Sequence, residues 1–277
     1  MSKDLVNFTV RTARNGSSLV DFLAEELGLS KRKAKGLLDA RNVHVNHKRV
    51  WMAQHTLAAG DIVEVQQVQK SGGEAEILWQ DKDYLVANKP AGILSNGPDS
   101  LETQLKKGQP GLQAVHRLDR DTTGCLIFAK SQEAFDAIVP LFREHGITKI
   151  YKAIAAGLIG KKELTISQPL EGKSAETRVQ VLAANKTASY ISVKLITGRT
   201  HQVRKHLAHI GHPLAGERQY AGGGSRNELL RAVPRQMLHA EKLRFTSPVS
   251  GEEIHCDAPL PQDFRDCLRI LGLNPPR

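Results

Sequence analysis

Cysteine is scarce in this chain, and its few cysteines are not arranged in pairs. The 277 residues contain three, Cys125, Cys256 and Cys267. Their spacing indicates neither a framework of disulfides nor a zinc site built from thiolates. Because a free cysteine commonly behaves as a small apolar side chain, we expect Cys125 to pack in the core.

Long apolar runs and the familiar cofactor motifs are also missing. No stretch approaches the roughly 18 apolar residues of a membrane span, and the start, MSKDLVNFTV, lacks the apolar core of a secretory signal. There is no P-loop, no dinucleotide glycine fingerprint and no His-Glu-x-x-His. These absences predict a cytoplasmic protein with no membrane partner, and they give no sign of a nucleotide, redox or metal cofactor.

Negative charge is in deficit. Lys and Arg number 39 against 29 Asp and Glu, which gives a formal net charge of +10 at pH 7. An excess of this size attracts polyanions over a long range, with an affinity that falls as the salt concentration rises. Basic enzymes without nucleic-acid partners also exist, so the charge indicates a class of partner and does not prove binding.

One stretch, HRLDRDTTG from His116 to Gly124, places a carboxylate among positive charges. Asp119 lies between Arg117 and Arg120, and nearby cations favour its ionised form. An ionised, partly desolvated Asp can act as a nucleophile or base, and the same cations can hold a phosphate backbone. A solvated, salt-bridged turn is the alternative. The apolar run CLIFA that follows favours a loop leading into a buried strand, where working groups are commonly presented.

HRLDRDTTG resembles the signature of the RluA family of RNA pseudouridine synthases, in which the Asp of His-Arg-Leu-Asp is catalytic. Further blocks follow the family's order: NKPAGIL (88–94), KIYKA (149–153), GRTHQVRKHLAHIGHPLAGERQYAG (198–222), LHAEKLRF (238–245) and APLPQDF (258–264). The resemblance implies an isomerase that breaks the glycosidic bond of a uridine in RNA and rejoins the uracil through carbon 5. It also implies that Asp119 is the catalytic residue.

Nothing is consumed in that reaction, so the resemblance implies no cofactor and no metal. One carboxylate suffices, by a logic close to that of glycosidases, because the detached uracil is itself the leaving group and stays in the pocket. Three roles remain open for Asp119 on the sequence alone: attack on the sugar, addition to the base, and abstraction of the 2′ proton.

Two residues of the other blocks are candidate partners of Asp119 and the uracil. Arg204 lies at the edge of the inward stripe of a helix expected to begin near Thr200, where a bidentate Arg–Asp pair can orient Asp119 and keep it ionised. Tyr151 is the candidate that stacks on the uracil, with its hydroxyl near the carbon that loses a proton. The alternatives are a surface Arg beside a core helix and a core Tyr.

Three more basic residues are candidate contacts to the substrate. Arg117 is a wedge or phosphate contact that fills the stack once the nucleoside is extruded, and Lys89 and Arg199 are contacts to the RNA backbone. The chain also departs from the family pattern, with Glu217 where the family commonly has Asp and SNGPD after Leu94. The second departure lies at the expected rim of the pocket and bears on the choice of target.

Four histidines, at positions 201, 206, 209 and 212, invite a metal-site interpretation with Asp119 as an oxygen ligand. On a helix, however, His206 and His209 lie on a flank away from His201, and the neighbouring Arg and Lys residues repel a divalent cation. Hydrogen bonds at the helix ends and contacts to RNA are the favoured uses of these histidines, and we predict no metal.

Residues 1–65 have the pattern of a small basic domain. The spacing predicts helices near 19–27 and after Ser30, and short strands near 43–46 and 62–65. The second helix carries a basic cluster: Lys31, Arg32, Lys33 and Lys35. A solvated helix face is the bland explanation. The module resembles the RNA-binding domain named after ribosomal protein S-four, which implies that the cluster binds RNA.

The rest of the chain predicts an α+β fold. Residues 66–76 are polar and aperiodic, typical of a linker, and residues 77–277 form the predicted catalytic domain. Its strands outnumber its helices and come in runs, which favours a mixed, largely antiparallel sheet, here with a central cleft. A helix is expected over 131–145, with Pro140 in a position to kink or split it. The N-terminal domain is the smaller, α/β RNA-binding part.

The leading hypothesis is a synthase that modifies large-subunit ribosomal RNA, because the N-terminal module favours a large structured substrate. A tRNA pseudouridine synthase is the runner-up. From other classes come a non-catalytic RNA-binding or ribosome-assembly factor on the same fold, and a metal-dependent hydrolase. We expect a monomer whose partner is RNA.

Overall fold

The chain folds into two compact units, residues 1–73 and 74–277. The computed structural model describes residues 5–39, 43–50, 52–66, 75–144, 146–222, 230 and 233–273. Most of the linker predicted over 66–76, namely 67–74, lies outside the described residues. Gln66 belongs to the last strand of the first unit and not to the linker.

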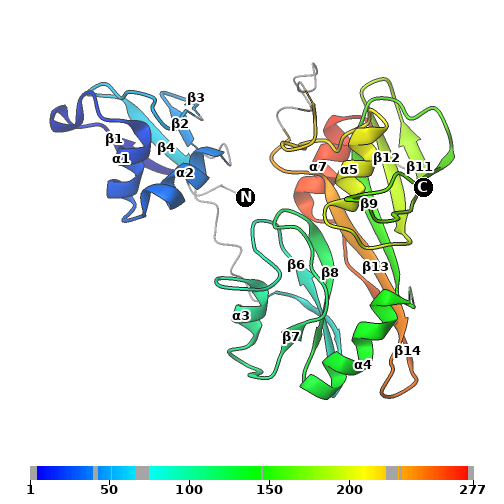
Figure 1. Cartoon of the computed structure of the whole chain (residues 1–277). Helices are drawn as coiled ribbons and strands as arrows, with labels where there is room; N and C mark the ends of the chain where they lie inside the picture. Colours follow the sequence, from blue (N-terminus) through cyan, green and yellow to red (C-terminus); the bar gives the residue numbers. More distant parts are fainter. Residues whose placement is uncertain are drawn as a thin grey trace. The chain divides into compact units, whose positions relative to one another are not determined.

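The first unit joins a small sheet to two helices (Figure 1). Its elements are β1 (Leu5–Thr9), η1 (Thr12–Arg14), α1 (Leu19–Glu26), α2 (Lys31–Asp39), β2 (Val43–Val45), β3 (Lys48–Arg49) and β4 (Ile62–Gln66). The strand order is β1-β4-β2-β3 and every pair is antiparallel. Ser18 caps α1 by accepting from the Asp21 amide, as its side-chain type favours. Ala34 and Leu38 bury the inner face of α2, so its basic residues are left exposed.

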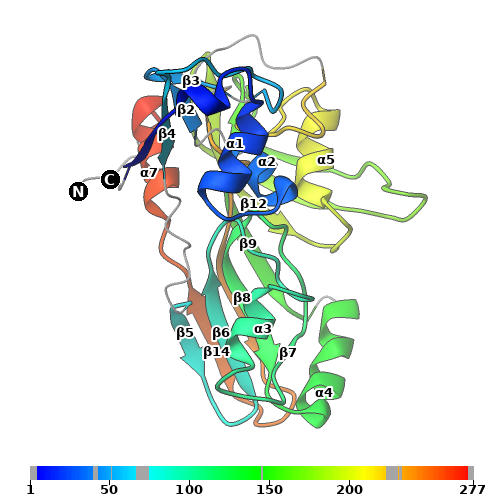
Figure 2. The same cartoon turned by 90° about the vertical axis from the view of Figure 1, so that its left-hand side faces the viewer.

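The second unit is built on one long sheet. Its strands are β5 (Ile77–Gln80), β6 (Tyr84–Lys89), β7 (Gln113–Ala114), β8 (Thr123–Ala129), β9 (Thr148–Ala156), β10 (Glu163–Ile166), β11 (Thr177–Ala184), β12 (Ala188–Leu195), β13 (Leu238–Thr246) and β14 (Glu253–Asp257). Its helices include α3 (Leu101–Leu105), α4 (Gln132–Arg143), α5 (Gln202–His209) and α7 (Gln262–Ile270). Figures 1 and 2 show α4 at the same end of the sheet as β14, with α5 and α7 near the other end.

The sheet is mixed and mostly antiparallel, which confirms the predicted fold class. Its order is β10-β11-β12-β9-β13-β8-β6-β5, with β14 paired to β13 and β7 to β8. Among the described strand pairs, β13 and β8 are parallel and the others are antiparallel. In the part of the chain that the structure describes, no helix is both long and apolar enough to cross a membrane.

Successive side chains of β8 point alternately to the two faces of the sheet and pack into two hydrophobic cores. Leu126 and Phe128 pack with α3 and α5 on one face, whereas Cys125 and Ile127 pack with α4 on the other. Every residue of β8 is buried, as expected of a strand covered on both faces. The prediction that Cys125 packs in the core is therefore confirmed. Helix α4 is continuous through Pro140, which lies in its last turns and removes a single amide donor, so the proline does not split it.

Gly124 fixes how closely β8 approaches β13. Its backbone has a φ of +108°, and a Cβ added there would lie 2.2 Å from the carbonyl oxygen of Ala240. Only glycine adopts this conformation at little cost and leaves room for the neighbouring strand. The end of HRLDRDTTG is thereby clamped against β13, and the Asp119 loop leaves the sheet at a defined place.

His239, on β13, supports the same junction and makes stability depend on pH. It is fully buried, with Nδ1 at 2.8 Å from Thr123 Oγ1 and Nε2 at 3.1 Å from the Ala258 carbonyl oxygen. Burial lowers its pKa to about 4, below the value of about 6.5 in an unfolded chain. The unfolded state therefore binds the proton more tightly. The contribution of neutral His239 is complete above pH 6.5 and is lost as the pH falls toward 4.

Replacing His239 should therefore make the unfolding free energy depend less on pH under acidic conditions. Between pH 7 and pH 5, we expect the unfolding free energy of His239→Gln to fall by about 2 kcal/mol less than that of the wild type. Urea unfolding at both pH values measures the two slopes. The exposed His255 gives the matched control, His255→Gln, which keeps the wild-type slope. Equal slopes for His239→Gln and the wild type would show that His239 does not titrate as described.

Candidate active site

A cleft of about 550 Å³ opens on the face of the sheet that carries α5. Its walls include the loop before β8 with Asp119, strand β9 with Tyr151, helix α5 with Arg204 and the start of β13 with Leu238. Helix α4 and the end of β12 also contribute lining residues. The loop is short and leads directly into a buried strand, as the sequence predicts. The central cleft expected in this domain is therefore present, and Asp119 and Tyr151 line it together.

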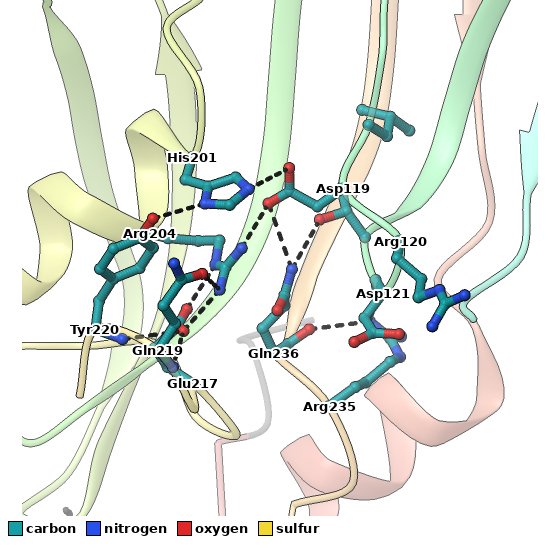
Figure 3. Close-up of polar contacts among 12 residues, drawn as sticks. Asp119, Arg120, Asp121, His201, Arg204, Glu217, Gln219, Tyr220, Arg235 and Gln236 are labelled. Atoms are coloured by element: carbon teal, nitrogen blue, oxygen red, sulfur yellow. Dashed lines mark hydrogen bonds and ion pairs between the residues drawn. The ribbon is translucent and has the colours of Figure 1, made fainter. Parts of the chain in front are cut away.

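The carboxylate of Asp119 is held from three directions (Figure 3). Arg204 Nη1 donates to Asp119 Oδ2 over 3.1 Å, and Gln236 Nε2 approaches the same oxygen at 3.5 Å. The Nε2 atom of His201 lies 3.5 Å from the other oxygen, Oδ1. One-fifth of the Asp119 side chain is exposed, so the carboxylate is reachable from the cleft but largely fixed within it.

Arg204 contacts two carboxylates, and it forms its bidentate pair with Glu217. Its Nε and Nη2 atoms donate to Glu217 at 2.7 and 2.8 Å, whereas Asp119 receives one bond. The predicted bidentate Arg–Asp pair is therefore wrong in detail. Burial tends to lower the pKa of Arg204, but the carboxylates of Glu217 and Asp119 outweigh it and raise the pKa. The geometry makes Arg204 a permanent cation at the base of the cleft.

Glu217 has a fully buried side chain and is completely paired. Besides Arg204, its Oε1 atom accepts from the backbone amides of Gln219 and Tyr220 at 2.8 and 3.3 Å. Burial alone would raise the pKa of Glu217, but these bonds hold it below the usual value. Glu217 therefore stays ionised and fixes the plane of the guanidinium that meets Asp119.

Tyr151 presents its ring to the cleft from β9. It pairs with Val193 on one side and Ala240 on the other, and 6% of its surface is exposed. Burial and the nearby charge of Asp119 raise the pKa of its hydroxyl, so the phenol stays protonated. A flat, neutral, amphipathic ring beside an ionised carboxylate suits a planar base with polar edges.

Comparison with known proteins agrees with this site. A family model described as RNA pseudouridylate synthase matches residues 83–209. Ribosomal large subunit pseudouridine synthase C of Salmonella typhimurium is 32% identical, with 92% of this chain and 93% of that protein covered. YhcT of Bacillus subtilis, named as an uncharacterized RNA pseudouridine synthase, is 30% identical, with 94% and 95% covered. The chain belongs to the RNA pseudouridylate synthase family.

A solved structure agrees as well. The chain titled Human RNA Pseudouridylate Synthase Domain Containing 4 has a TM-score of 0.61 at 26% identity, covering 73% of this chain and 94% of that one. The resemblance to the RluA family drawn from the sequence is thus confirmed. The protein isomerises uridine in RNA to pseudouridine, as the members of its family do. The family match at residues 83–209 includes Asp119, Tyr151 and Arg204.

Lys89 corrects one of the site predictions for this synthase. Its side chain is fully buried, and its ammonium donates to the carbonyl oxygens of Pro90, Ile93 and Arg120 at 2.8, 2.7 and 2.9 Å. All three donors are used inside the protein, so Lys89 is not available to a phosphate. The prediction of a backbone contact is wrong. Lys89 instead ties the Lys-Pro-x-Gly turn to the residue that follows Asp119.

The other predicted basic residues divide between the two units. Arg117 and Arg199 are exposed and line the cleft, where Arg199 Nε also donates to the Ser174 carbonyl oxygen at 3.0 Å. The cluster of the first unit lies on α2 and is exposed, as the sequence predicts: Lys31, Arg32, Lys33 and Lys35. Its role in binding RNA stays a prediction.

The histidines do not form a metal site. Among the described residues, no three His, Cys, Asp or Glu side chains converge to hold a metal ion. His206 is buried, with Nδ1 at 2.9 Å from Thr177 Oγ1 and Nε2 at 2.8 Å from the Gln168 carbonyl oxygen. His201 instead faces Asp119, and its Nδ1 lies 2.7 Å from the Tyr220 hydroxyl. Burial lowers the pKa of His201, and the charges of Arg204 and Lys205 oppose the raising effect of Asp119.

Sequence reasoning missed the residues that brace the Asp119 loop from behind. Gln236 reaches both Asp119 Oδ2 and Thr122 Oγ1 at 3.5 Å. Arg235 forms a bidentate pair with Asp263 and donates to the Asp121 carbonyl oxygen at 2.9 Å. Glu217 was visible only as a departure from the family pattern. A polar Arg-Gln pair one residue before the LHAEKLRF strand is the signal that could have pointed to Arg235 and Gln236.

Proposed function

We propose that this synthase modifies a uridine of large-subunit ribosomal RNA and that Asp119 is its catalytic residue. The observation that carries the catalytic assignment is the cleft in which an Arg204-held carboxylate lies beside the Tyr151 ring. The choice of RNA follows relatives named ribosomal large subunit pseudouridine synthase C and D, which share 32% and 31% identity with this chain over most of its length. A tRNA substrate is the alternative outcome.

Asp119 acts on the ribosyl–uracil unit in its ionised form. The guanidinium of Arg204 stabilises the negative charge and fixes its direction before the substrate arrives, so little reorganisation is needed at the moment of reaction. Glu217 acts through Arg204, because its paired oxygens hold the guanidinium in plane. His201 and Gln236 limit the rotation of the carboxylate from its other sides.

Tyr151 and the cleft walls keep the detached uracil in place while it turns. Tyr151 lines the cleft and its hydroxyl stays protonated. In the proposed complex its ring covers the base, with the hydroxyl near the carbon that loses a proton. Leu238 supplies an apolar wall. Since the uracil departs from and returns to the same ribose, retention within the cleft replaces the second carboxylic acid that a glycosidase uses.

Two exposed arginines help to extrude the uridine. An enzyme that reaches a base inside folded RNA must flip it out of the stack, at a cost of a few kcal/mol. Arg117 and Arg199 are exposed and line the cleft, which supports the proposal that Arg117 fills the vacated stack and Arg199 contacts the backbone. Both contacts stabilise the extruded state and leave the chemical step to Asp119.

The basic face of α2 contributes affinity for the folded RNA. Removing residues 1–65 is expected to weaken binding to a structured ribosomal RNA fragment by at least about tenfold and to lower its salt dependence. The rate on a short RNA that spans only the cleft changes little. Filter binding at several salt concentrations and single-turnover kinetics measure the two quantities.

A quadruple variant with Gln at 31, 32, 33 and 35 is the matched form that keeps the first unit whole. It should reproduce most of the loss in affinity. Full affinity after either change would refute a role for this unit in RNA binding.

The test of the substrate is a map of pseudouridines in ribosomal and transfer RNA from cells with and without the gene. The proposal predicts that at least one large-subunit ribosomal pseudouridine disappears and that the tRNA map is unchanged. Loss confined to tRNA would favour the alternative substrate, and two identical maps would overturn the proposal. The monomeric state and cytoplasmic location expected from the sequence stay predictions, and sedimentation and fractionation of cell extracts test them.

A further inference from the structure

The cleft continues past Tyr151 along the same strand. Lys149 lies two residues before Tyr151 on β9, so the two side chains share one face of the sheet, about 6–7 Å apart along the strand. Leu195 stands opposite Lys149 on β12, just as Val193 stands opposite Tyr151. Lys149, Leu195 and Phe142 all line the cleft. This end of the cleft is separate from the groups that hold Asp119.

Lys149 has an unusual environment for a lysine. Its ammonium lies 5.4 Å from the centre of the Phe142 ring, and a Cβ added at Gly198 would be 3.7 Å from it. Other half-buried lysines of this unit, such as Lys152 and Lys205, pair with a carboxylate. Among the described residues, the Lys149 side chain has neither an ion pair nor a hydrogen bond. Burial accordingly lowers its pKa.

The neighbouring histidine, His116, is uncharged and adds no charge at this end of the cleft. His116 stacks on Phe142 with ring centres 5.1 Å apart, and its Nε2 accepts from the Ile127 amide over 3.2 Å. Burial and the charge of Lys149 lower the pKa of His116 to about 3, so its ring is neutral. The distal end of the cleft therefore presents the partly desolvated positive charge of Lys149 beside flat and apolar walls.

From this geometry we infer that Lys149 binds the phosphodiester next to the target uridine inside the cleft. The inference rests on the proposed function, since a uracil lying on Tyr151 carries its flanking phosphate toward one end of β9. A partly desolvated ammonium without a carboxylate is stabilised most by an anion, and the apolar walls strengthen that attraction. A base edge offers only neutral acceptors and leaves the charge uncompensated. Gly198 adds no side chain beside the ammonium.

The test combines one protein change with one RNA change. A substrate hairpin is made with an uncharged methylphosphonate at the phosphate 5′ or 3′ of the target uridine. For the wild type, we expect one of the two replacements to weaken binding on the order of tenfold, since one charged contact is lost. Lys149→Met should bind the unmodified RNA as weakly as the wild type binds the methylphosphonate RNA. Adding that methylphosphonate should not weaken the binding of Lys149→Met further. Lys149→Arg keeps the positive charge, so its binding should still be weakened by the methylphosphonate.

Lys194 provides the matched control, because it is an exposed lysine of β12 that lines a different hollow from Lys149. Lys194→Met should respond to the methylphosphonate as the wild type does. Equal losses for Lys149→Met and the wild type would overturn the inference. So would a Lys149→Met defect that follows the identity of the flanking base and not the charge of the phosphate.

A second readout requires no turnover. Uridine 5′-monophosphate, uridine 3′-monophosphate and uridine are titrated into protein labelled at the Leu and Val methyl groups, with Leu195 and Val115 as reporters of this end of the cleft. One monophosphate should bind the wild type more tightly than uridine does, and Lys149→Met should remove the difference. This binding result does not require that pseudouridine is formed. Failure of the proposed function can therefore be distinguished from failure of the inference about Lys149. No preference for either monophosphate would contradict the inference.

Discussion

Asp119→Asn is expected to abolish pseudouridine formation, with a loss of about 10,000-fold or more in single-turnover rate, as when a catalytic nucleophile or base is removed. The amide has nearly the same shape, so the cleft and the contact with Arg204 Nη1 can persist. What disappears is the negative charge that acts on the nucleoside. The affinity for substrate RNA should change less than about threefold, because truncating a reacting group need not remove binding contacts. Quench-flow kinetics and filter binding measure the two quantities.

Asp121→Asn is the matched control for that experiment. It changes a carboxylate of the same loop that does not line the cleft, and the loop is held there through its backbone carbonyl by Arg235. Its rate should stay within about threefold of the wild type, as expected of a change away from the reacting groups. An active Asp119→Asn enzyme would remove Asp119 from the chemistry. A variant that forms no pseudouridine yet keeps the full cellular role would instead favour the non-catalytic alternative, a role in RNA binding or ribosome assembly.

Arg204→Met is expected to have the largest effect on stability, a loss of about 3–5 kcal/mol in unfolding free energy. The change strands Glu217, whose side chain is fully buried, and frees the carboxylate of Asp119. Unpaired buried charge costs more than the original pair contributed, because nothing replaces the lost solvation. The rate should also fall sharply, since Asp119 loses the cation that fixes it. Urea unfolding followed by circular dichroism measures the first effect.

The pH dependence separates this explanation from a simple packing defect. In the wild type, Arg204 holds the pKa of Glu217 low, so the stability that Glu217 contributes is present above its unfolded pKa and is lost as the pH falls below about 4.3. Without Arg204, burial raises that pKa, and protonation relieves the unpaired charge. The variant therefore regains stability as the pH falls toward about 4.3, and the wild type loses stability below it. The stability gap between Arg204→Met and the wild type should narrow across both ranges. A constant gap would indicate lost packing alone.

Two further variants sharpen the Arg204 experiment. Arg199→Met removes an exposed arginine from the same cleft and should change the unfolding free energy by less than about 0.5 kcal/mol. Arg204→Lys keeps the charge but cannot serve Glu217 with a fork and Asp119 with a third donor direction. It should recover only part of the stability and activity. Full recovery by Lys would show that the fork is unimportant.

Local patterns in the sequence predicted most of the elements that carry the site. The apolar run after HRLDRDTTG became β8, and the stripe of Val203 and Leu207 became the buried face of α5. Both follow from the periodicity of apolar side chains over a few residues, which can be recognised in the sequence itself. The location of Asp119 in a loop before a buried strand is of the same kind. Helix α4 ran through Pro140 because tertiary packing outweighed one missing hydrogen bond.

The parts that the sequence could not predict depend on contacts between distant segments. Asp119 and Arg204 are 85 residues apart, and Asp119 and Gln236 are 117 apart. Which carboxylate takes the fork of Arg204 is decided by the turn after α5 that carries Glu217, and no local pattern encodes that turn's direction. Lys89 was misjudged for the same reason. A lysine beside a proline gives no sign that Ile93 and Arg120 will bring carbonyl oxygens around it.

The proposed role of Asp119 is to make pseudouridine in ribosomal RNA. Its most direct test is complementation of cells that lack the gene, with pseudouridine mapped in the large-subunit RNA. We expect the wild-type gene to restore each missing pseudouridine, and Asp119→Asn, present at the same level and bound to the same RNA, to restore none. Restoration of those pseudouridines by Asp119→Asn would contradict the proposed role.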